Sequence, residues 1–502
     1  MPQGERHADH LEVERTYLLP VGGDLPDLTG LDSIATVDEP HELKLVADYY
    51  DTDDLRLLRA GTTLRRRTGG VDQGWHVKIP APPDGRLELR RPLGRSPLPP
   101  KAVRGLVAAR TAVAPLRRVA TIANHRTVRV LRNAASASLA EVCHDRVTAT
   151  LPDGRQLDWR ELEVELTGGS LDLLEAVEAV LSAAGGQVSP WPSKLRRALG
   201  ADAGLDPGLD PGDETAGAVV LARVAELVEE LVGWDAAVRR DVPDSVHKAR
   251  VTIRRLRSVL AAHRRLLDRA GTDPVRTELK WFAEVLGAVR DDEVMRDDLT
   301  DLVDTQPHDT VRAHTRRRMG RLLSDRERQH DKALRAAMDS RRHGELWAAL
   351  HDVVARPPWT ERAARPPAGE LSKALARQLR RLDQARGHLA AQLPGPERDV
   401  ALHELRKTVK RLRYTVEVAL PRAGRPAHKL IRRLERFQSY AGQLHDDQVA
   451  LQLLSDAADQ ETAFAFGHLH GVLAERVADA WAALDEEEAR LDAPKLRAKL
   501  LR

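Results

Sequence analysis

Charged residues alternate with apolar residues in several short segments near the start of the chain. Carboxylates recur at every second position in HLEVERTYL and in ELEVEL, and guanidiniums do so in TTLRRR. Because residues two apart share one face of a strand, the charged side chains of each segment project together. The paired positions are Glu12 with Glu14, Glu161 with Glu163 and Glu165, and Arg65 with Arg67.

Two environments would suit such strands, and they predict different chemistry. In an open antiparallel sheet the charged face would simply meet water. In a closed sheet the same face would line an interior, where unpaired charge is costly unless a ligand or a metal balances it. Carboxylate oxygens favour Mg²⁺ or Mn²⁺ over zinc, and Arg or Lys side chains bind phosphate oxygens. A closed sheet therefore predicts a phosphate site with a divalent metal.

A basic pattern occurs twice in the later part of the chain. The segment HKARVTIRRLR at 247–257 returns as HELRKTVKRLR at 403–413, which is 156 residues later. A second pair of similar segments, LKWFAEVLGAVRDDEV and LERFQSYAGQLHDDQV, starts at residues 279 and 434. Self-similarity with so long a period predicts two related helical bundles that face each other.

In each copy, the His and the basic residues fall on one helical stripe at about 100° per residue, beside an apolar stripe. A solvated helix face usually mixes both signs of charge, because like charges four residues apart repel each other. Each copy has five Lys or Arg residues, and Glu404 is the only acid in either. Either the stripes are solvated, or together they line a groove for a long polyanion. The stripe residues are His247, Arg250, Arg254, Arg257 and Arg264, and then His403, Arg406, Lys410 and Arg413.

Length and composition limit the class of protein. A chain of 502 residues is too long for one hydrophobic core and predicts two or three domains. The single cysteine, Cys143, excludes an internal disulfide and a thiolate metal cluster, and it suits a reducing cytoplasm. We find no long apolar run that would predict a membrane span or a secretion signal. Aromatic residues make up 3% of the chain, which argues against binding of single-stranded nucleic acid by base stacking.

The periodicity of the sequence changes near its middle. Strand periodicity dominates residues 8–199, with short helices predicted at 99–110 and 170–184, and helical periodicity dominates from residue 217 onward. A stretch rich in Gly, Pro and Asp predicts a flexible linker at 201–216. We therefore expect a multidomain α+β protein with domains at 1–200 and 217–502, the second in halves of about 217–354 and 370–502. Its long helices are predicted at 217–240, 244–268, 274–290, 308–340, 369–392, 398–420, 427–444 and 463–490.

The first region resembles the CYTH domain, the family of triphosphate tunnel metalloenzymes. The resemblance covers about residues 8–200 and rests on HLEVERTYL, YYDTDDLRLLRAGTTLRRR, WHVKIP, LELRRPL, LAEVCHDRV, ELEVEL and PSKLRRAL, in this order. It implies an eight-stranded antiparallel β-tunnel barrel that binds a triphosphate chain and a divalent metal, Mg²⁺ or Mn²⁺. Members of the family include inorganic triphosphatases, thiamine triphosphatases and class IV adenylyl cyclases.

The resemblance also implies roles for individual residues. The expected metal ligands are Glu12, Glu14, Asp145, Glu163 and Glu165, of which the four glutamates are also the expected catalytic residues. The expected phosphate-binding residues are Arg65, Arg67, Lys78, Arg126 and Lys194, and Glu88 matches a further tunnel carboxylate. The implied reaction is attack of an activated water on a phosphoryl group, while the basic residues neutralise the developing charge.

One position departs from the family's pattern. Thr16 stands where the opening Glu-x-Glu-x-Lys signature has its lysine, and strand alternation aims the neighbouring Arg15 at the opposite face. Thr16 offers no charge to a phosphate or a leaving group, and losing such an interaction can slow a reaction strongly. The expectation is a metal-dependent phosphohydrolase, and the alternative is a catalytically weak protein that binds polyphosphate or is targeted to it.

The second region resembles the CHAD domain, a conserved-histidine α-helical domain. The resemblance covers about 217–502 and rests on both copies of His-x-x-Arg-x-x-x-(Arg/Lys)-Arg-Leu-Arg and of Gly-x-x-x-Asp-Asp-x-Val. It implies a pair of pseudo-twofold-related four-helix bundles that bind inorganic polyphosphate. The implied binding residues are His247, Arg250, Arg254, Arg257, His403, Arg406, Lys410 and Arg413, with Arg255, Lys407 and Arg411 on neighbouring arcs. We predict that Asp291-Asp292 and Asp446-Asp447 cap helices rather than bind metal.

Three functions are compatible with these patterns. The first is a polyphosphate-binding protein whose tunnel hydrolyses triphosphate or short polyphosphate. The second is the catalytically weak binding protein, and the third is a nucleic-acid binder that uses the helical groove. The favoured partner is inorganic polyphosphate or triphosphate rather than nucleic acid or a membrane, and the expected location is the cytoplasm, at polyphosphate granules.

Overall fold

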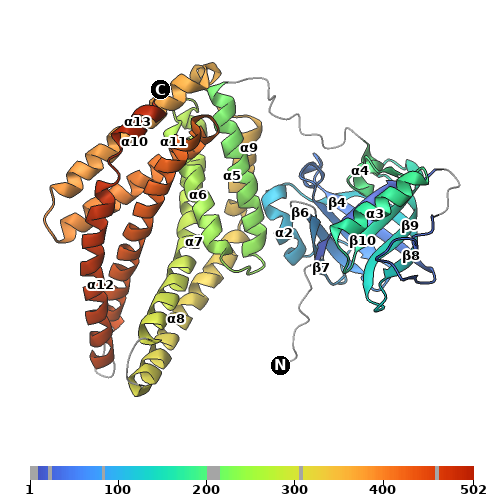
Figure 1. The fold of residues 1–502 in the computed structure, drawn as a ribbon, viewed down its shortest axis with the longest axis horizontal. Helices are drawn as coiled ribbons and strands as arrows, with labels where there is room; N and C mark the ends of the chain where they lie inside the picture. Colours follow the sequence, from blue (N-terminus) through green and yellow to red (C-terminus); the bar gives the residue numbers. More distant parts are fainter. Residues whose placement is uncertain are drawn as a thin grey trace. The chain divides into compact units, whose positions relative to one another are not determined.

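The computed structural model describes residues 10–20, 25–81, 85–200, 215–304, 309–457 and 463–501. Contacts divide the chain into two compact units, Met1–Gly208 and Leu209–Arg502. The first unit is built around one β-sheet and the second is helical (Figure 1). The predicted linker at 201–216 lies for the most part outside the described residues.

The first unit contains most of the strands predicted from the alternating segments, and its two longer helices lie where they are predicted. Its strands are β1 (His10–Glu12), β2 (Glu14–Leu18), β3 (Thr36–Val37), β4 (His41–Asp51), β5 (Thr63–Thr68), β6 (Gly74–Ala81), β7 (Gly85–Arg91), β8 (Arg117–Arg132), β9 (Ser138–Thr150), β10 (Gln156–Leu166) and β11 (Gln187–Val188). Its helices are α1 (Arg56–Arg59), α2 (Lys101–Thr111), α3 (Leu171–Ala183) and α4 (Lys194–Leu199).

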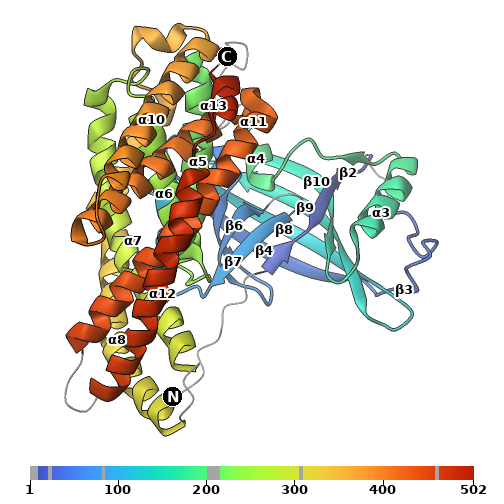
Figure 2. The same ribbon diagram turned by 60° about the vertical axis from the view of Figure 1, so that its left-hand side comes forward.

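The sheet closes on itself through its first strand. Val13 interrupts that strand, so that β1 pairs with β7 while β2 pairs with β10, both antiparallel. The two ends of the strand order β1-β7-β6-β5-β4-β8-β9-β10-β2 are therefore joined through the chain itself. With β1 and β2 counted as one interrupted strand, eight antiparallel strands of the described chain form the barrel (Figure 2). The predicted fold class of this region is confirmed.

The barrel is apolar on its outside and charged on its inside. Helix α2 lies over Leu64, Trp75 and Leu89, and α3 lies over β2, β9 and β10, so the apolar side chains of these strands are buried beneath helices. Because side chains alternate along a strand, the charged residues between them point to the interior. In the alternating segments, the apolar residues therefore form an outer face that packs on helices, and the charged residues face the interior of the barrel rather than bulk water.

The helical unit consists of long helices joined by short connections (Figure 1). They are α5 (Ala216–Val238), α6 (Ser245–Ala262), α7 (Arg269–Asp304), α8 (Asp309–Met338), α9 (Arg341–Ala355), the 3₁₀ turn η1 (Glu361–Ala364), α10 (Pro367–Ala390), α11 (Pro396–Ala457), α12 (Ala463–Ala489) and α13 (Pro494–Leu500). Among the described residues, none of these helices is long and apolar enough to cross a membrane.

Two bundles with the same order of helices make up this unit, as predicted. Helices α5, α6, α7 and α8 form the first bundle, and α10, the two arms of α11, and α12 form the second. Helix α11 bends at Gly424, whose φ of 51° lies in the left-handed region, between Pro421 and Pro426. Its two arms correspond to α6 and α7. The far ends of the bundles share one core, in which Leu299 of α7 and Leu469 of α12 are buried.

The prediction that the paired aspartates cap helices is wrong. Asp291-Asp292 lies inside α7 and Asp446-Asp447 lies inside α11, well before either helix ends. Asp292 and Asp447 are only 1% and 2% exposed. Basic side chains from the next helix neutralise these two carboxylates, so each helix runs through its aspartate pair and is tied to its neighbour. The partners are Arg326 and His330 of α8 for Asp292, and Arg476 of α12 for Asp447.

Helix α9 was not among the helices predicted from the sequence. Ser340 caps it, because its hydroxyl accepts a hydrogen bond from the N–H of His343 at 3.2 Å. Leu346, Trp347 and Leu350 form its buried face. A serine ahead of apolar residues at helical spacing was the signal for this helix in the sequence.

Candidate functional site

A cavity of about 740 Å³ lies inside the barrel, and about half of the residues that line it are charged. Thr16 lines it as well. Asp145 and Glu88 are fully buried and lie behind the lining, where they contact lining cations. The other residues that the CYTH resemblance implies all line the cavity: Glu12, Glu14, Arg65, Arg67, Lys78, Arg126, Glu163, Glu165 and Lys194.

Strand pairing arranges the interior charges in rows across the barrel wall. Arg126 on β8 lies opposite Asp145 on β9, which lies opposite Glu161 on β10. Lys78 on β6 lies opposite Glu88 on β7 in the same way. Directly paired residues of antiparallel strands have neighbouring side chains on one face. The register therefore places a carboxylate beside each of these two cations.

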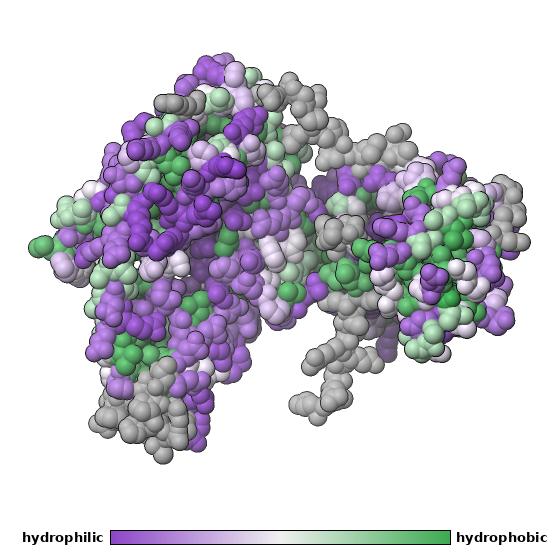
Figure 3. Space-filling model, in the orientation of Figure 1, coloured by the Kyte–Doolittle hydropathy of each residue, from purple (hydrophilic) through white to green (hydrophobic). Residues whose placement is uncertain are grey.

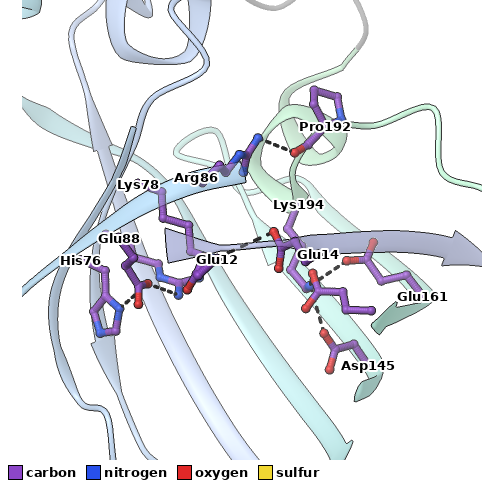
Figure 4. A network of polar contacts seen from close by, with 12 residues as sticks. Glu12, Glu14, His76, Lys78, Arg86, Glu88, Asp145, Glu161, Pro192 and Lys194 are labelled. Atoms are coloured by element: carbon purple, nitrogen blue, oxygen red, sulfur yellow. Dashed lines mark hydrogen bonds and ion pairs between the residues drawn. The ribbon is translucent and has the colours of Figure 1, made fainter. Parts of the chain in front are cut away.

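Lys194 stands at the centre of one charged cluster (Figure 4). Its ammonium lies 2.9 Å from Asp145 and 2.7 Å from Glu161, and it also contacts Glu163. Lys194 reaches this position from the first turn of α4, which Ser193 caps by accepting a hydrogen bond from the N–H of Arg196. Burial alone would lower the pKa of Lys194, but the three carboxylates raise that pKa well above its usual range.

Arg126 belongs to the same cluster. It donates hydrogen bonds to both oxygens of Asp145, at 2.8 and 2.7 Å, and another to Glu163. Burial alone would raise the pKa of Glu163, but Lys194 and Arg126 hold that pKa well below its usual range. Lys194 and Arg126 thus both contact Asp145 and Glu163 within this cluster.

Lys78 on β6 contacts one carboxylate from each part of the interrupted first strand, Glu12 of β1 and Glu14 of β2. Its ammonium lies 2.5 Å from Glu12 and 3.9 Å from Glu14. Burial raises the pKa of Glu12 to about 7 against the attraction of Lys78, and the charges of Glu88 and Glu14 add to the rise. Proton loss from Glu12 is thus expected close to neutral pH.

Glu88 is the buried anchor of the cations on this side. The ring Nδ1 of His76 lies 2.8 Å from its Oε1, Arg65 donates to the same oxygen at 3.3 Å, and Arg90 contacts the other oxygen. Burial alone would raise the pKa of Glu88, but His76, Arg65 and Lys78 bring that pKa far below its usual range. Glu88 thus holds Arg65 in place at the cavity wall.

A third row consists only of carboxylates. Glu14, Glu165 and Glu141 lie directly opposite one another on β2, β10 and β9, and all three line the cavity. Burial raises the pKa of Glu165, repulsion by Glu14 adds to the rise, and Lys78 opposes it. Like charges directly opposite one another destabilise a sheet. The barrel therefore maintains a concentration of negative charge that a cation would relieve.

The donor set fits a hard divalent cation. One oxygen from each of Asp145, Glu161 and Glu163 lies within 4.8 Å of the others, and the all-carboxylate row lines the same cavity. Oxygen donors without His or Cys favour Mg²⁺ or Mn²⁺. Because the Lys194 ammonium lies among the first three carboxylates, a metal ion there would take over its role as counter-charge.

Several residues of the cavity were not predicted as site residues. Arg90 lines the cavity, and Glu161 lies behind the lining in contact with Lys194. Each follows the alternation of a predicted neighbour, and that alternation was the signal for them in the sequence. Glu141 and Arg86 line the cavity too, and they share the alternation of Asp145 and Glu88 on their own strands. Arg86 donates to the backbone carbonyl of Pro192 at 2.7 Å, which ties β7 to the segment leading into α4 (Figure 4).

In the helical unit, the two basic stripes meet at one junction. Helix α6 packs against the first arm of α11, and hydrophilic residues dominate the surface over these helices (Figure 3). Burial lowers the pKa of Lys410 to about 7, and the charges of Arg254, Arg406 and Arg250 add to the effect. Cations from both copies of the repeat thus act on one another. Part of this charge has no partner, because the Nε atoms of Arg254 and Arg406 are buried without an acceptor among the described residues.

The histidines of the two stripes lie close to these cations. His247 lies near Arg290 and Arg254, and burial followed by these charges lowers its pKa. The ring of His403 lies 6.0 Å from the ring of His445, a residue that was not predicted. Arg290 and His445 occupy equivalent positions of the 155-residue repeat. A position-by-position comparison of the two copies could therefore have identified Arg290 and His445 from the sequence.

Arg257 and Arg413, which end the two repeated segments 247–257 and 403–413, differ from the other stripe residues. Arg413 lies 3.4 Å from Glu417 and 3.6 Å from Glu435, and its guanidinium stands over the ring of Tyr414. Arg257 lies near Arg276 and Glu284 of α7, and also near Arg411 of α11. Arg250, Arg254, Arg406 and Lys410 are therefore the predicted residues that the fold brings together, and Arg257 and Arg413 flank them.

Comparisons with known proteins agree with this architecture. A sequence profile of the CYTH domain matches residues 10–198, and one of the CHAD domain matches residues 222–455. An uncharacterized protein of Mycobacterium tuberculosis is 35% identical over 502 residues, which cover 95% of this chain and 94% of that protein.

Two solved structures match part of the chain. PptA from Streptomyces chartreusis is 19% identical with a TM-score of 0.46, over 54% of this chain and 99% of that one. The CHAD domain from the plant Ricinus communis is 21% identical with a TM-score of 0.44, over 57% of this chain and 94% of that one. From the two matched profiles and the full-length relative, we conclude that the chain belongs to the family of proteins in which a CYTH domain precedes a CHAD domain.

Proposed function

We propose that the protein binds inorganic polyphosphate and that its tunnel binds and hydrolyses triphosphate or short polyphosphate with a divalent metal. The observation that carries this proposal is the cavity wall, where carboxylates and cations lie side by side around one interior. Cations alone would suit any anion. Carboxylates beside them suit a ligand that arrives with its own metal ion, as a phosphate chain does.

The cations of the tunnel would exchange partners when the ligand enters. Lys78, Lys194 and Arg126 each contact carboxylates, and a phosphate chain would offer them oxygens of the same charge. Arg65 would stay oriented because Glu88 holds it from behind. The residues that would bind metal are those predicted: Glu12, Glu14, Asp145, Glu163 and Glu165.

The divalent ion would supply charge to offset that developing on the transferred phosphoryl group. Around it, the cations of this chain would orient the phosphate chain and neutralise its non-reacting oxygens. The lining has one aromatic residue, Tyr49, and it is otherwise largely charged or small. This composition favours an inorganic phosphate chain over a nucleotide, whose base would find little surface to stack on.

Phosphate release from a panel of substrates tests the tunnel proposal. We expect release from tripolyphosphate to exceed release from ATP and thiamine triphosphate by about tenfold or more. Release should rise between about pH 6 and pH 8, because Glu12 must lose its proton to bind a cation and its pKa is about 7. Absence of release from all three compounds, or release that a chelator leaves unchanged, would contradict the proposal.

The helical unit is proposed as the site for longer chains. Arg250, Arg254, Arg406 and Lys410 meet at the junction of α6 and α11, and a polymer of phosphates would satisfy cations that have few acidic partners. Retention at polyphosphate granules in the cytoplasm would follow from such binding. Nucleic acid should compete poorly for this face, because the repeat supplies few aromatic residues for base stacking.

A specific observation favours the alternative that the tunnel binds but scarcely hydrolyses. Thr16 lines the cavity and lies directly opposite Glu163, so a cation is missing at a position that faces the carboxylate cluster. Replacing Thr16 by Lys is therefore expected to raise the rate of phosphate release from tripolyphosphate by about tenfold or more. A Thr16→Met variant of similar length serves as the control without charge. An unchanged rate in Thr16→Lys would show that Thr16 does not limit catalysis.

A further inference from the structure

Lys410 occupies an unusual place in the basic junction. It is partly buried on the first arm of α11, where that arm meets α6, and it forms no ion pair with an acidic residue of the described chain. The cations that act on it are Arg250 and Arg254 from α6, and Arg406 from its own helix. A positive charge at Lys410 is therefore opposed from both helices.

The acidic residues near the junction leave this repulsion largely in place. Asp446, on the second arm of α11, is the carboxylate that acts on Lys410, and it also faces Arg406. Asp291 of α7 is paired with Arg250 at 2.7 Å. Other ionisable groups that face this region are His403, His445, Arg413 and Tyr414 of α11, His247 and Arg255 of α6, and Arg290 of α7.

The internal repeat makes Lys410 distinct from its counterpart. Arg250 corresponds to Arg406, and Arg254 corresponds to Lys410. An arginine keeps its proton in proteins, whereas a lysine in a desolvated, cationic place can lose it near neutral pH. Burial and the three arginines bring the pKa of Lys410 to about 7, as the geometry leads one to expect.

We propose that Lys410, which lies among arginines where α6 meets α11, is the residue of the polyphosphate site that gains a proton when a polyanion binds. This inference rests on the proposed polyphosphate binding by the helical unit. A phosphate chain across the junction would bring negative charge close to Lys410, where the protein itself provides little. Protonation of Lys410 and binding of the chain would therefore favour each other. The affinity for polyphosphate would then fall as pH rises, because Lys410 loses its proton.

Calorimetric titration of the full chain with polyphosphate, at about pH 8.5 in two buffers of different ionisation enthalpy, measures this proton. The wild-type protein is expected to take up about one proton on binding, and its affinity should fall by up to about tenfold per pH unit above 7. At this pH the histidines are neutral before binding, since burial and neighbouring cations lower the pKa values of His247, His403 and His445.

Two variants and a control separate the contribution of Lys410 from the rest. Lys410→Arg keeps the charge at every pH, so it should bind tightly with no uptake attributable to this site. Lys410→Met never carries the charge, so it should bind weakly at every pH. The control, Lys373→Arg, changes an exposed lysine of α10 that pairs with Glu370, and it should behave as the wild type. Thermal unfolding checks that each variant is folded.

The outcomes distinguish this inference from the function on which it depends. If the wild-type chain fails to bind polyphosphate even near pH 6, the proposed function and this inference both fail. If it binds, yet Lys410→Arg takes up as many protons and loses as much affinity with pH as the wild type, polyphosphate binding stands. In that case Lys410 is not the proton-linked residue.

Discussion

Replacing Glu14 by Gln is expected to slow metal-dependent phosphate release from tripolyphosphate by about 100-fold or more. Glu14 is the suitable carboxylate to change, because its nearest cation, Lys78, lies 3.9 Å away, whereas Glu12 and Glu163 are in close ion pairs. The change removes one charge from the all-carboxylate row and leaves the clusters around Lys194 and Glu88 intact. The measurement is the initial rate of release with Mg²⁺ or Mn²⁺, together with the dissociation constant for Mn²⁺ alone.

Glu178→Gln is the matched control for this variant. Glu178 lies on α3, outside the barrel, where it pairs with Arg15 at 2.8 Å, so the same chemical change is made on the other side of the wall. The control should keep the wild-type rate and metal affinity. A wild-type rate in Glu14→Gln would remove Glu14 from the metal site, and an equal loss in both variants would point to the stability of the barrel instead.

The double variant Arg254→Gln/Arg406→Gln is expected to bind polyphosphate about 100-fold more weakly than the wild type. Each arginine would contribute a charge-assisted contact to phosphate, worth about 1.5 kcal/mol or more, and the two stand on different helices of one junction. The slope of log affinity against log salt should also become less steep by about two, because two fewer counterions would be released. Titration calorimetry at several salt concentrations gives both quantities.

A control with the same change in net charge distinguishes position from overall electrostatics. Arg341 and Arg356 lie at the two ends of α9. Each pairs with an acid of α9 four residues away, Arg341 with Glu345 and Arg356 with Asp352. Arg341→Gln/Arg356→Gln should lose no more than about twofold in affinity. If both double variants bound as the wild type does, the helical junction would be excluded as the polyphosphate site.

Much of the barrel could be predicted because strand alternation is a local property. HLEVERTYL, TTLRRR and ELEVEL place the charges at every second position on one face whatever lies around them, and apolar residues between these charges are the ones that α2 and α3 cover. Thr16 and Arg15 were placed on opposite faces in the same way, and Arg15 indeed contacts Glu178 outside the barrel. The charged character of the barrel interior followed from the alternation of side chains along each strand.

The contacts inside the barrel could not be predicted in the same way. Lys194 meets Asp145 and Glu161 because α4 returns to the cavity, and the split at Val13 is what brings Glu12 beside Lys78. Closure of a sheet depends on strand order and register, which are properties of all eight strands together. A pattern within one strand carries no information about its partner's register.

In the helical unit, the aspartate pairs show where local rules fail. A Gly followed by Asp-Asp suits a helix end, and yet α7 and α11 continue, because Arg326 and Arg476 of the next helix neutralise Asp292 and Asp447. A capping rule considers only the neighbouring residues in the chain. The partners that override it come from 29 or more residues away.

The sequence by itself determined the two kinds of periodicity, the internal repeat, and hence the charged faces and the order of the two domains, since all of these depend on spacing along one segment. Tertiary structure alone decided that α6 and α11 bring both basic stripes to one junction, and that Lys410 lies there among arginines. The reason is physical: the protonation of a side chain depends on its burial and on every charge within a few ångströms. Those charges are gathered by packing, from segments that the chain keeps far apart.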